Sequence, residues 1–393
     1  MHVLWMDWDS FGRDGIYNEF LSRGYTVERF MVNRVENTRL NKVYAEQMIR
    51  FMADKKFDFV FSYNYFPVIS IACNACRVKY VSWVYDSPQA ALYSNTIVFP
   101  YNYIFIFDKS AYRDLLQYGI DTIYYLPMAT DVRQYDSYEV SRNIREVYSA
   151  PITFVGSTYG EKKHQLYKTL QNVNDYTKGY LEGVMQAQKK IYGELFLEKM
   201  LTPDIMEEIL KVQPWQINED GFERPSWIFA QYHLARRVTA LERQETLRML
   251  SERYRVVLYT NEATPGLPKV ENKGMSGLYK ESVYIYRCSK INLNISLRSI
   301  VSGMPYRIFE IMGSGGFLLS NYQEDFFDYF IPGEDFDYYS NQEELMNKAE
   351  YYLTHEKERA EIARNGYEKI KKFHSFKNRL DTILEIINRK REY

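Results

Sequence analysis

Short apolar runs alternate with amphipathic stretches along the first 130 residues of the chain. The apolar runs predict strands at 2–6, 25–31, 57–61, 79–84, 103–107 and 122–126, and the stretches between them predict helices near 15–22, 41–54, 67–76 and 109–117. Gly24 and Gly119 each follow a predicted helix and precede a strand, where a left-handed helix cap favours glycine. Because strand–helix–strand units connect parallel strands with one handedness, the pattern predicts a doubly wound, Rossmann-like α/β sheet.

The alternation weakens in a polar stretch near 132–149 and then starts again. A buried strand is predicted at 152–155, followed by a Gly-Ser-Thr-Tyr-Gly turn and a helix with Leu166, Leu170 and Val173 on one face. Residues 162–250 are mainly helical in pattern, and strands return at 255–259, 283–286, 291–296 and 316–319. The chain therefore divides into a predicted domain over 1–135 and a second over 150–375, with a helical insertion at about 175–245 in the second.

The C-terminal part of the chain is helical in pattern. Ser340 and Glu343 have the spacing of a capping box, which predicts a helix that carries Leu345, Ala349 and Tyr352. The last stretch repeats its apolar positions at i, i+3, i+4 and i+7, in Leu380, Ile383, Leu384 and Ile387. We expect this last helix, over 376–393, to be a packing element that lies on the first domain.

Composition and charge exclude some classes of partner. The 393 residues include 50 Lys and Arg against 51 Asp and Glu, so the net charge is -1. A general nucleic-acid binder needs a basic excess to neutralise phosphates, which argues against that class. Tyr and Phe are abundant, with 37 and 23 residues, and both sugar-binding surfaces and ordinary core packing use such side chains.

The cysteines indicate a reducing compartment. Cys73, Cys76 and Cys288 are too few for a disulfide framework in a chain of this length. Cys73 and Cys76 form a CxxC pair, but no second pair or nearby His completes a zinc site, so we expect buried structural thiols. The first residues lack a signal-peptide pattern and no window approaches 18 uninterrupted apolar residues. We therefore expect a soluble cytoplasmic protein without a transmembrane segment, and any membrane association would be peripheral.

Two segments carry candidate chemistry. In the first, Gly156, Ser157, Thr158 and Tyr159 open the sequence GSTYGEKK. Glycine lets the backbone approach an anion, a following helix offers free N–H groups, and Lys162 or Lys163 adds positive charge. A tight turn without a catalytic role fits the same residues.

The second segment, over 292–320, has more polar chemistry. A strand ends near Ser296, a loop with Gly303 follows, and a helix begins near Tyr306. A carboxylate early in such a helix, here Glu310, can accept hydrogen bonds from both hydroxyls of a ribose, while Arg307 or Arg298 can meet a diphosphate. The alternative is a solvated Glu310 with glycines that only cap the helix.

These residues lead to a family resemblance. The segments PYRIFEIMGSGGFLLSNYQEDFFDYFIPGEDFDYYSNQEEL and YYLTHEKERAEIARNGYEKI resemble the C-terminal, group 1-like domain of GT-B glycosyltransferases, in particular the group similar to the spore maturation protein CgeB. The segments DFVFSYNYFPVIS, YVSWVYDSP, YIFIFDKSAYRDLLQYG and YYLPMATD are similar to the N-terminal domain, formerly of unknown function, that accompanies it. The resemblance covers most of the chain outside the insertion. It implies a GT-B fold, in which two Rossmann-like domains face each other across a cleft.

The resemblance also implies a function. A sugar would move from a nucleotide diphosphate donor, with UDP or dTDP favoured over GDP, to a hydroxyl of a protein or glycan acceptor. The donor would bind mainly the second domain and the acceptor mainly the first. Glu310 matches the acid that holds the donor ribose, Arg307 matches an arginine just before that acid, and the loop from Gly156 to Tyr159 matches a loop near the phosphates.

The stereochemistry of transfer stays open in the sequence. Ser302 stands eight positions before Glu310, where many retaining enzymes of this fold have a second Glu, so inversion is slightly favoured. An inverting enzyme needs a general base, and the candidates are Asp7, Asp9 and Asp14 after the first strand and Asp86 in WVYDSP. Asp86 is the first choice, because the Ser-Pro that follows it forces a turn at a strand end. Its alternative role is to cap that turn.

No metal or cofactor is implied, because enzymes of this fold typically use helix N-termini and basic side chains against the diphosphate charge. The sequence agrees, since it has no HExxH motif. Asp7-Trp8-Asp9 resembles the DxD motif of metal-dependent glycosyltransferases, but it follows the first strand of a predicted parallel sheet, so we do not expect it to bind a metal. A function of another class is a structural or assembly protein of a spore or cell-surface layer that keeps the fold without catalysis.

Overall fold

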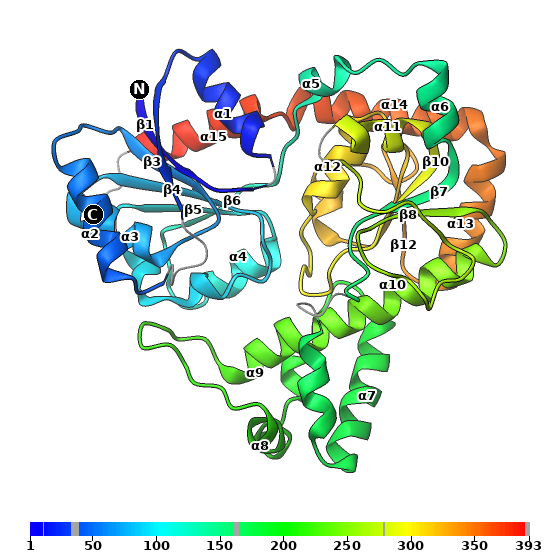
Figure 1. Ribbon diagram of the computed structural model, residues 1–393, viewed down its shortest axis with the longest axis horizontal. Helices are drawn as coiled ribbons and strands as arrows, with labels where there is room; N and C mark the ends of the chain where they lie inside the picture. The colour runs from blue at the N-terminus through cyan, green and yellow to red at the C-terminus, as the bar shows by residue number, and fades with distance from the viewer. Residues whose placement is uncertain (11, 33–38, 161–164, 278–279, 390–393) are drawn as a thin grey trace. The chain divides into compact units, whose positions relative to one another are not determined.

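The computed structural model describes residues 1–10, 12–32, 39–160, 165–277 and 280–389, which form two compact units (Figure 1). The first unit contains the described residues of Met1–Thr130, Ile217–Arg224 and His374–Tyr393, and the second contains those of Asp131–Gln216 and Pro225–Phe373. These ranges differ from the predicted domains at several places, since residues 374–375 belong to the first unit and the stretch 136–149 between the predicted domains belongs to the second. Residues 131–135 belong to the second unit, and residues 217–224, within the predicted insertion, belong to the first.

Six parallel strands form the sheet of the first unit, in the order β2-β1-β3-β4-β5-β6. The strands are β1 (His2–Asp7), β2 (Thr26–Met31), β3 (Phe59–Tyr63), β4 (Lys79–Val84), β5 (Asn102–Ile106) and β6 (Ile123–Tyr125). The helices that connect them are α1 (Arg13–Ser22), α2 (Lys42–Ala53), α3 (Pro67–Cys76) and α4 (Lys109–Leu116). Every element predicted in this region is present, with ends within two residues of the prediction.

Aromatic side chains fill the core of the first unit. Trp5 stacks on Phe61 with ring centroids 5.2 Å apart, and Phe20 meets the Phe61 ring edge-on at 5.5 Å. All three side chains are almost completely buried. Packing therefore accounts for part of the high aromatic content.

The last helix, α15 (Phe376–Asn388), packs on α1 of the first unit. Phe376 lies so close to Gly15 that a Cβ atom there would come within 2.0 Å of its ring. Ser375 and Asn378 form a capping box at the start of the helix. Three of its four predicted apolar positions are buried, namely Leu380, Ile383 and Ile387.

Residues 217–224 are held in the first unit by a buried ion pair. Arg39 Nε lies 2.7 Å from Asp220 Oδ1, and Arg39 Nη2 lies 3.0 Å from Glu223 Oε2. Glu223 is fully buried, and Asn218 donates to its other carboxylate oxygen at 2.6 Å. This segment thus leaves the helical insertion and joins the first unit through charge pairing.

The second unit contains a six-stranded parallel sheet in the order β12-β11-β10-β7-β8-β9. The strands are β7 (Ala150–Val155), β8 (Val256–Tyr259), β9 (Glu271–Asn272), β10 (Ser289–Asn294), β11 (Leu318–Asn321) and β12 (Asp337–Tyr339). Counted within the unit, this is the order 6-5-4-1-2-3, the Rossmann order. The helices outside the insertion are α5 (Val132–Asp136), α6 (Arg142–Tyr148), α10 (Ala235–Ser251), α11 (Lys280–Cys288), α12 (Tyr306–Gly313), α13 (Gln342–Thr354) and α14 (Glu356–Phe373).

Three predictions for this unit need correction. Residues 283–286 are in α11 and not in a strand, because a short apolar run of β-branched and aromatic residues fits a buried helix equally well. Residues 166–172 form a 3-10 helix, where a regular helix was predicted. The capping interactions of α13 lie one residue later than predicted, since Asn341 Oδ1 accepts from Glu344 N and the Glu344 carboxylate accepts from Ser340 N, both at 2.8 Å.

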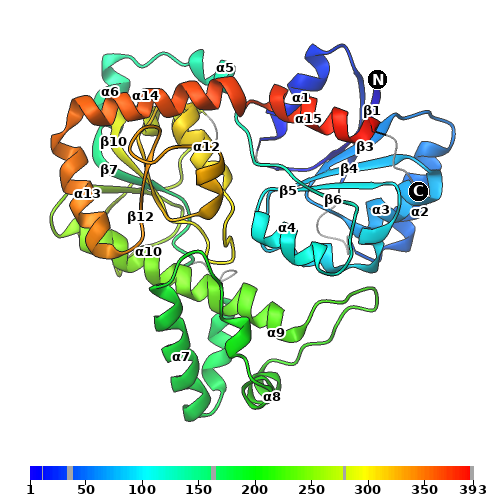
Figure 2. The same ribbon diagram turned by 180° about the vertical axis from the view of Figure 1, so that it is seen from behind.

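The two faces of the second sheet have different surroundings. Ile152, Phe154, Ile291 and Leu293 share an apolar cluster with α10, α13 and α14. Figure 2 shows α13 and α14 alongside this sheet. On the opposite face Asn292 donates to the Tyr286 carbonyl of α11 at 3.0 Å. The alternation of strand side chains therefore separates an apolar face from a more polar one.

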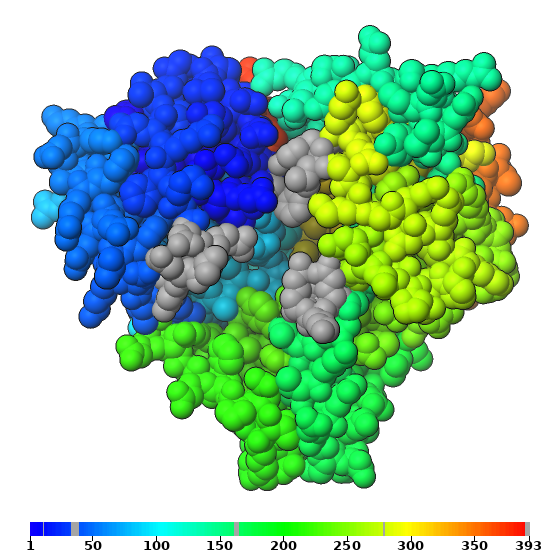
Figure 3. Space-filling model, viewed as in Figure 1, coloured from blue at the N-terminus to red at the C-terminus, as the bar shows by residue number. Residues whose placement is uncertain are grey.

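The insertion has a core of its own. Its helices are α7 (Asp175–Lys189), α8 (Pro203–Val212) and α9 (Pro225–Ile228). Helix α7 packs on α10, α9 leads into α10, and all three lie away from the sheet (Figure 1). Leu181, Ile209, Phe229 and Val238 belong to one buried cluster that is separate from the sheet cluster. In the space-filling view the side chains close the gaps that the ribbon leaves between these helices (Figure 3).

The ion pair of Arg39 gives a first testable prediction. Arg39→Met leaves the Glu223 carboxylate buried, with Asn218 as its remaining partner among the described residues, and should lower the free energy of unfolding by about 3 kcal/mol. Arg50→Met is the control, because its ion pair with Glu46 is exposed and should be worth less than about 1 kcal/mol. Urea unfolding of both variants tests this, and equal midpoints would contradict a stabilising role for the buried pair.

Candidate functional site

The topology of the second sheet indicates where a ligand binds. Strands β7 and β10 are neighbours, and the chain order runs away from them in opposite directions, to β8 and β9 on one side and to β11 and β12 on the other. Ligands of such sheets bind beyond the carboxyl ends of the strands at this switch point. Gly156 directly follows β7, Asn294 ends β10, and α12 begins at Tyr306 after the next loop.

Arg307 connects these three elements. A Cβ atom on Gly156 would lie 2.5 Å from Arg307 Nη2, and the φ of Gly156 is +148°, so this position requires glycine. Arg307 Nη1 donates to Asn294 Oδ1 at 3.0 Å. The guanidinium lies 5.0 Å from the centre of the Phe154 ring. One side chain at the start of α12 therefore contacts the ends of both switch-point strands.

Glu310 lies one turn further along α12, on the same side as Arg307. Its side chain is half-buried, and its carboxyl group receives no hydrogen bond from the part of the chain that the structure describes. Burial raises the pKa of Glu310 to about 7, although the charge of Arg307 acts in the opposite direction. A carboxyl group without a hydrogen-bonding partner and with a raised pKa is typical of a functional site.

In the loop after β7, the Thr158 and Gly160 N–H groups and the hydroxyls of Ser157 and Thr158 are used within the protein, which differs from the prediction that Ser157 and Thr158 bind the donor. The Glu262 carboxylate accepts from Thr158 N at 2.9 Å and Gly160 N at 2.7 Å, and also from the hydroxyls of Ser157 and Thr158. Desolvation raises the pKa of Glu262, but these hydrogen bonds outweigh it and the pKa is lowered. The loop therefore binds an internal anion.

Other predicted donor-binding residues differ in their surroundings. The Tyr159 ring lies 4.8 Å from the Arg243 guanidinium. Gly303 is buried in the loop that leads to α12. Lys162 and Lys163 lie outside the described residues.

Arg298 has a structural role, which corrects its assignment to the donor site. Its Nε donates to Glu242 Oε2 at 2.7 Å, and both side chains are buried. Its two other nitrogens donate to the Ile191 and Lys189 carbonyls at 2.8 and 2.7 Å. Through these hydrogen bonds Arg298 connects its loop to α10 and to the C-terminal end of α7 and the residues that follow it.

Two buried residues of this site were missed in the sequence. Arg243 donates to the Ser157 carbonyl at 2.6 Å and to the Ile295 carbonyl, and lies 5.1 Å from the Phe154 ring. Desolvation lowers the pKa of Arg243 to about 10. Glu262 follows β8 at the same edge of the sheet. The position of Glu262 after a predicted strand was the available signal, whereas nothing local marks Arg243.

The candidate bases of the first unit do not form one cluster. Asp7 is buried, and it accepts from Arg13 Nη2 at 3.0 Å and Trp5 Nε1 at 3.2 Å, so its role is structural. Asp9 and Asp14 are exposed near the start of α1. Asp86 is exposed and follows β4. In the sheet, β3 lies between β4 and β1, the strand that precedes Asp9 and Asp14.

Asn64 positions Asp86. Its Nδ2 donates to Asp86 Oδ2 at 2.7 Å, while its Oδ1 accepts from the backbone N–H groups of Tyr85 and Asp86 at 3.1 and 3.2 Å. Asn64 has a φ of +60°, a conformation that Asn tolerates better than most residues. An Asn three residues after the strand predicted at 57–61 was the available sequence signal for this role.

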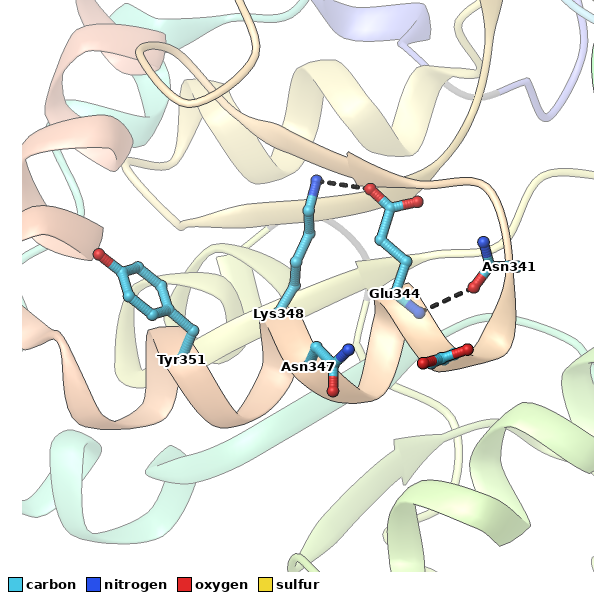
Figure 4. Close-up of a pocket in the computed structure, with 6 residues that line it drawn as sticks. Asn341, Glu344, Asn347, Lys348 and Tyr351 are labelled. Atoms are coloured by element: carbon cyan, nitrogen blue, oxygen red, sulfur yellow. Dashed lines mark hydrogen bonds and ion pairs between the residues drawn. The ribbon is translucent and has the colours of Figure 1, made fainter.

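Other features of the described residues carry no site. They contain no group of three or more His, Cys, Asp or Glu side chains placed to hold a metal, and no helix among them is long and apolar enough to cross a membrane. Cys73 and Cys288 are buried thiols and Cys76 is partly buried. A surface hollow of about 550 Å³ lies along α13 (Figure 4), but Lys348 there already pairs with Glu344 at 2.9 Å.

Comparisons with known proteins place this geometry in a family of folds. A family model described as "Glycosyl transferase-like" matches residues 236–385, a range that contains Arg243, Arg307 and Glu310. No curated protein matches the chain.

Several solved structures are similar over nearly the whole chain. Anabaena Alr3699/HepE, solved in complex with UDP and glucose, is 11% identical with a TM-score of 0.54, covering 98% of this chain and 99% of that one. A glycosyltransferase from Rickettsia africae is 11% identical with a TM-score of 0.55, covering 98% and 97%. Sucrose-phosphate synthase from Thermosynechococcus elongatus is 8% identical with a TM-score of 0.55, covering 98% of each chain. The predicted α/β fold of GT-B type is therefore confirmed, while the grouping with CgeB stays a prediction.

The raised pKa of Glu310 predicts how stability depends on pH. Its folded-state pKa of about 7 lies above the ordinary value of 4.5, so the stability that its proton contributes is complete below about pH 4.5 and is lost as the pH rises through about 7. Above about pH 7 the folded protein holds a buried, ionised Glu310 carboxylate, which costs stability. Glu310→Gln removes this charge and should raise the free energy of unfolding by roughly 1–3 kcal/mol at pH 8, with little effect near pH 5.

Urea unfolding at several pH values measures this difference. The control is Glu334→Gln, whose side chain is exposed and should show no such pH dependence. A Glu310→Gln effect of the same size at pH 5 and pH 8 would show that Glu310 ionises normally.

Proposed function

We propose that this protein is a glycosyltransferase that moves a sugar from a nucleoside diphosphate sugar to a hydroxyl group of a protein or glycan acceptor. One observation carries the proposal: Arg307 and the unpaired Glu310 lie together on the first turns of α12, at the switch point of the second sheet. The GT-B fold and the glycosyl transferase-like match over 236–385 support it. UDP is the donor nucleotide that we favour, because the similar Anabaena structure contains it.

Each part of the donor has a matching group in this site. The two ribose hydroxyls donate hydrogen bonds to the Glu310 carboxylate, which needs them to offset its burial. The diphosphate accepts from Arg307 and from N–H groups of the first turn of α12, where Pro305 at the N-cap provides no side-chain cap. Arg243, which also lies near the Phe154 ring, 5.1 Å from its centre, adds a second positive charge. These charges support a mechanism in which a metal ion is not required.

The acceptor side of the reaction uses the first unit. We assign Asp86 as the general base that takes the proton of the acceptor hydroxyl, with Asn64 as its positioning residue. An inverting mechanism follows from this assignment and from Ser302 in place of a second Glu. The resemblance to the CgeB group supports a spore or cell-surface component as the acceptor.

Donor binding is the direct test of the nucleotide site. Glu310→Ala should weaken UDP binding about 10- to 100-fold, because charge-assisted hydrogen bonds to the ribose are lost, and 2′-deoxy-UDP should bind the unchanged protein more weakly than UDP. The affinity for UDP should also fall as the pH drops below about 7, since Glu310 then becomes protonated. Isothermal titration calorimetry measures all three effects. Glu334→Ala is the matched control, and an unchanged affinity in Glu310→Ala would overturn the ribose assignment.

The general base is tested by donor hydrolysis, with water as the acceptor. Asp86→Asn should slow UDP release from UDP-glucose by about 100-fold or more and leave UDP affinity unchanged. The control is Asp121→Asn, which removes the charge of another exposed carboxylate in the same unit. Equal loss of rate in the two variants, or loss of UDP affinity in Asp86→Asn, would contradict the assignment.

A further inference from the structure

A second polar cavity lies in the second unit, apart from Arg307 and Glu310. It has a volume of about 230 Å³, and its described lining comes from Tyr159, Gly160 and Gln165, from the 3-10 helix over Leu166–Asn172 and from one face of α10. Three of its lining residues are cations, namely Lys168, Arg236 and Arg237, and none of the described residues that line it is a carboxylate. Such a cavity has a strongly positive lining for its size.

The two arginines of this cavity have no anionic partner among the described residues. Neither Arg236 nor Arg237 makes a hydrogen bond or an ion pair there, and the Nε atom of Arg236 is buried without an acceptor. Their guanidinium groups lie instead over aromatic rings, Arg236 5.9 Å from the centre of Tyr159 and Arg237 5.9 Å from that of Tyr167. Arg243 on the same helix differs, because carbonyl groups accept from its guanidinium. Unused donors of this kind fit an oxyanion that enters from outside.

The local fold keeps these side chains together. Arg236, Ala240 and Gln244 follow each other at intervals of four residues, so they share one face of α10. A π-helical turn over Phe229–Leu234 precedes this helix, and such turns are frequent at functional sites. It places Tyr232 beside Arg236, with 5.8 Å between the ring centre and the guanidinium.

The cavity is distinct from the proposed donor site, although the two are connected. From Arg307, contacts run through Phe154 to Arg243 and from Arg243 to Tyr159, whose ring also meets Arg236. Two rings and one buried arginine therefore link Arg236 to Arg307. Arg307, Glu310 and Arg243 do not line the cavity, whereas Tyr159, the last residue of the loop predicted to lie near the phosphates, does.

We propose that this cavity binds a phosphorylated sugar. The guanidinium groups of Arg236 and Arg237 have the fork geometry that phosphate oxygens accept from, and Lys168 adds charge. Tyr159 and Tyr167 also line the cavity, so aromatic side chains, which sugar-binding surfaces use, border the cations.

Amide groups and the cavity size complete the match. The Gln165 Oε1 atom is buried without a donor and can accept from a sugar hydroxyl, and the Gln244 amide also lines the cavity. A volume of about 230 Å³ suits one sugar ring with its phosphate.

Glucose 6-phosphate is the probe for this site, used with the full chain in isothermal titration calorimetry. We expect it to bind, inorganic phosphate to bind more weakly, and glucose to give no measurable binding. The double variant Arg236→Gln, Arg237→Gln should lose at least about tenfold in affinity. The control Arg253→Gln removes an exposed charge just beyond α10 and should bind like the unchanged protein. The methyl phosphodiester of the sugar tells whether the site prefers a terminal phosphate or one within a chain, and binding of either supports the site.

The outcomes separate this inference from the proposed function. The double variant should keep its affinity for UDP, which shows that it is folded. If it loses UDP binding as well, Lys168→Gln on the exposed 3-10 helix replaces it and should weaken glucose 6-phosphate binding several-fold. No binding of glucose 6-phosphate or of its methyl phosphodiester, or equal binding by the unchanged protein and the variants, overturns the phosphorylated-sugar site. Absence of UDP binding alone contradicts only the proposed donor site.

Discussion

The candidate site depends on the contact between the Arg307 guanidinium and the backbone of Gly156. Only a residue without a Cβ atom leaves room for this guanidinium, and only glycine adopts the φ of +148° there at low cost. The same guanidinium is bound by Asn294 at the end of β10. The first turn of α12 is thereby held against both switch-point strands, and this placement buries Glu310 one turn later. The close approach of Arg307 to Gly156 therefore places the Arg307 guanidinium and the Glu310 carboxyl group, with its raised pKa, together at this end of the sheet.

The way the second unit satisfies its other charges makes this site distinct. Glu262 is surrounded by N–H and hydroxyl donors of the loop after β7, and Arg298 is paired with Glu242 and two carbonyls. Those groups fix loops in place, because their hydrogen-bonding capacity is used within the protein. Glu310 and the two arginines on the first turn of α10 have no such partners among the described residues. Polar groups that a fold buries or crowds without partners are candidates for external ligands.

The sequence predicted the architecture well where the pattern was regular. The elements of the first sheet and most of the second follow from apolar runs separated by amphipathic stretches, and the Arg307 and Glu310 pair is visible because both residues lie on one short helix. The strand prediction for residues 283–286 was wrong because the middle of α11, over 282–286, is buried on every side, so these four residues show no polar positions that would reveal a helical period. Glu262, Arg243 and Asn64 act on partners about 20 to 105 residues away in the chain, so no local pattern reveals these partners, although Glu262 and Asn64 each follow a predicted strand. From the sequence, Arg298 was assigned to the donor diphosphate because its actual partner, Glu242, lies 56 residues away in the chain and could not be recognised.

A crystal structure of the protein with UDP is the most direct measurement. The account predicts UDP beyond the carboxyl ends of β7 and β10, with its ribose hydroxyls about 2.6–3.2 Å from the Glu310 carboxylate and its diphosphate beside Arg307. UDP bound elsewhere on the chain, or bound with Glu310 and Arg307 untouched, would contradict the assignment of this switch point as the donor site.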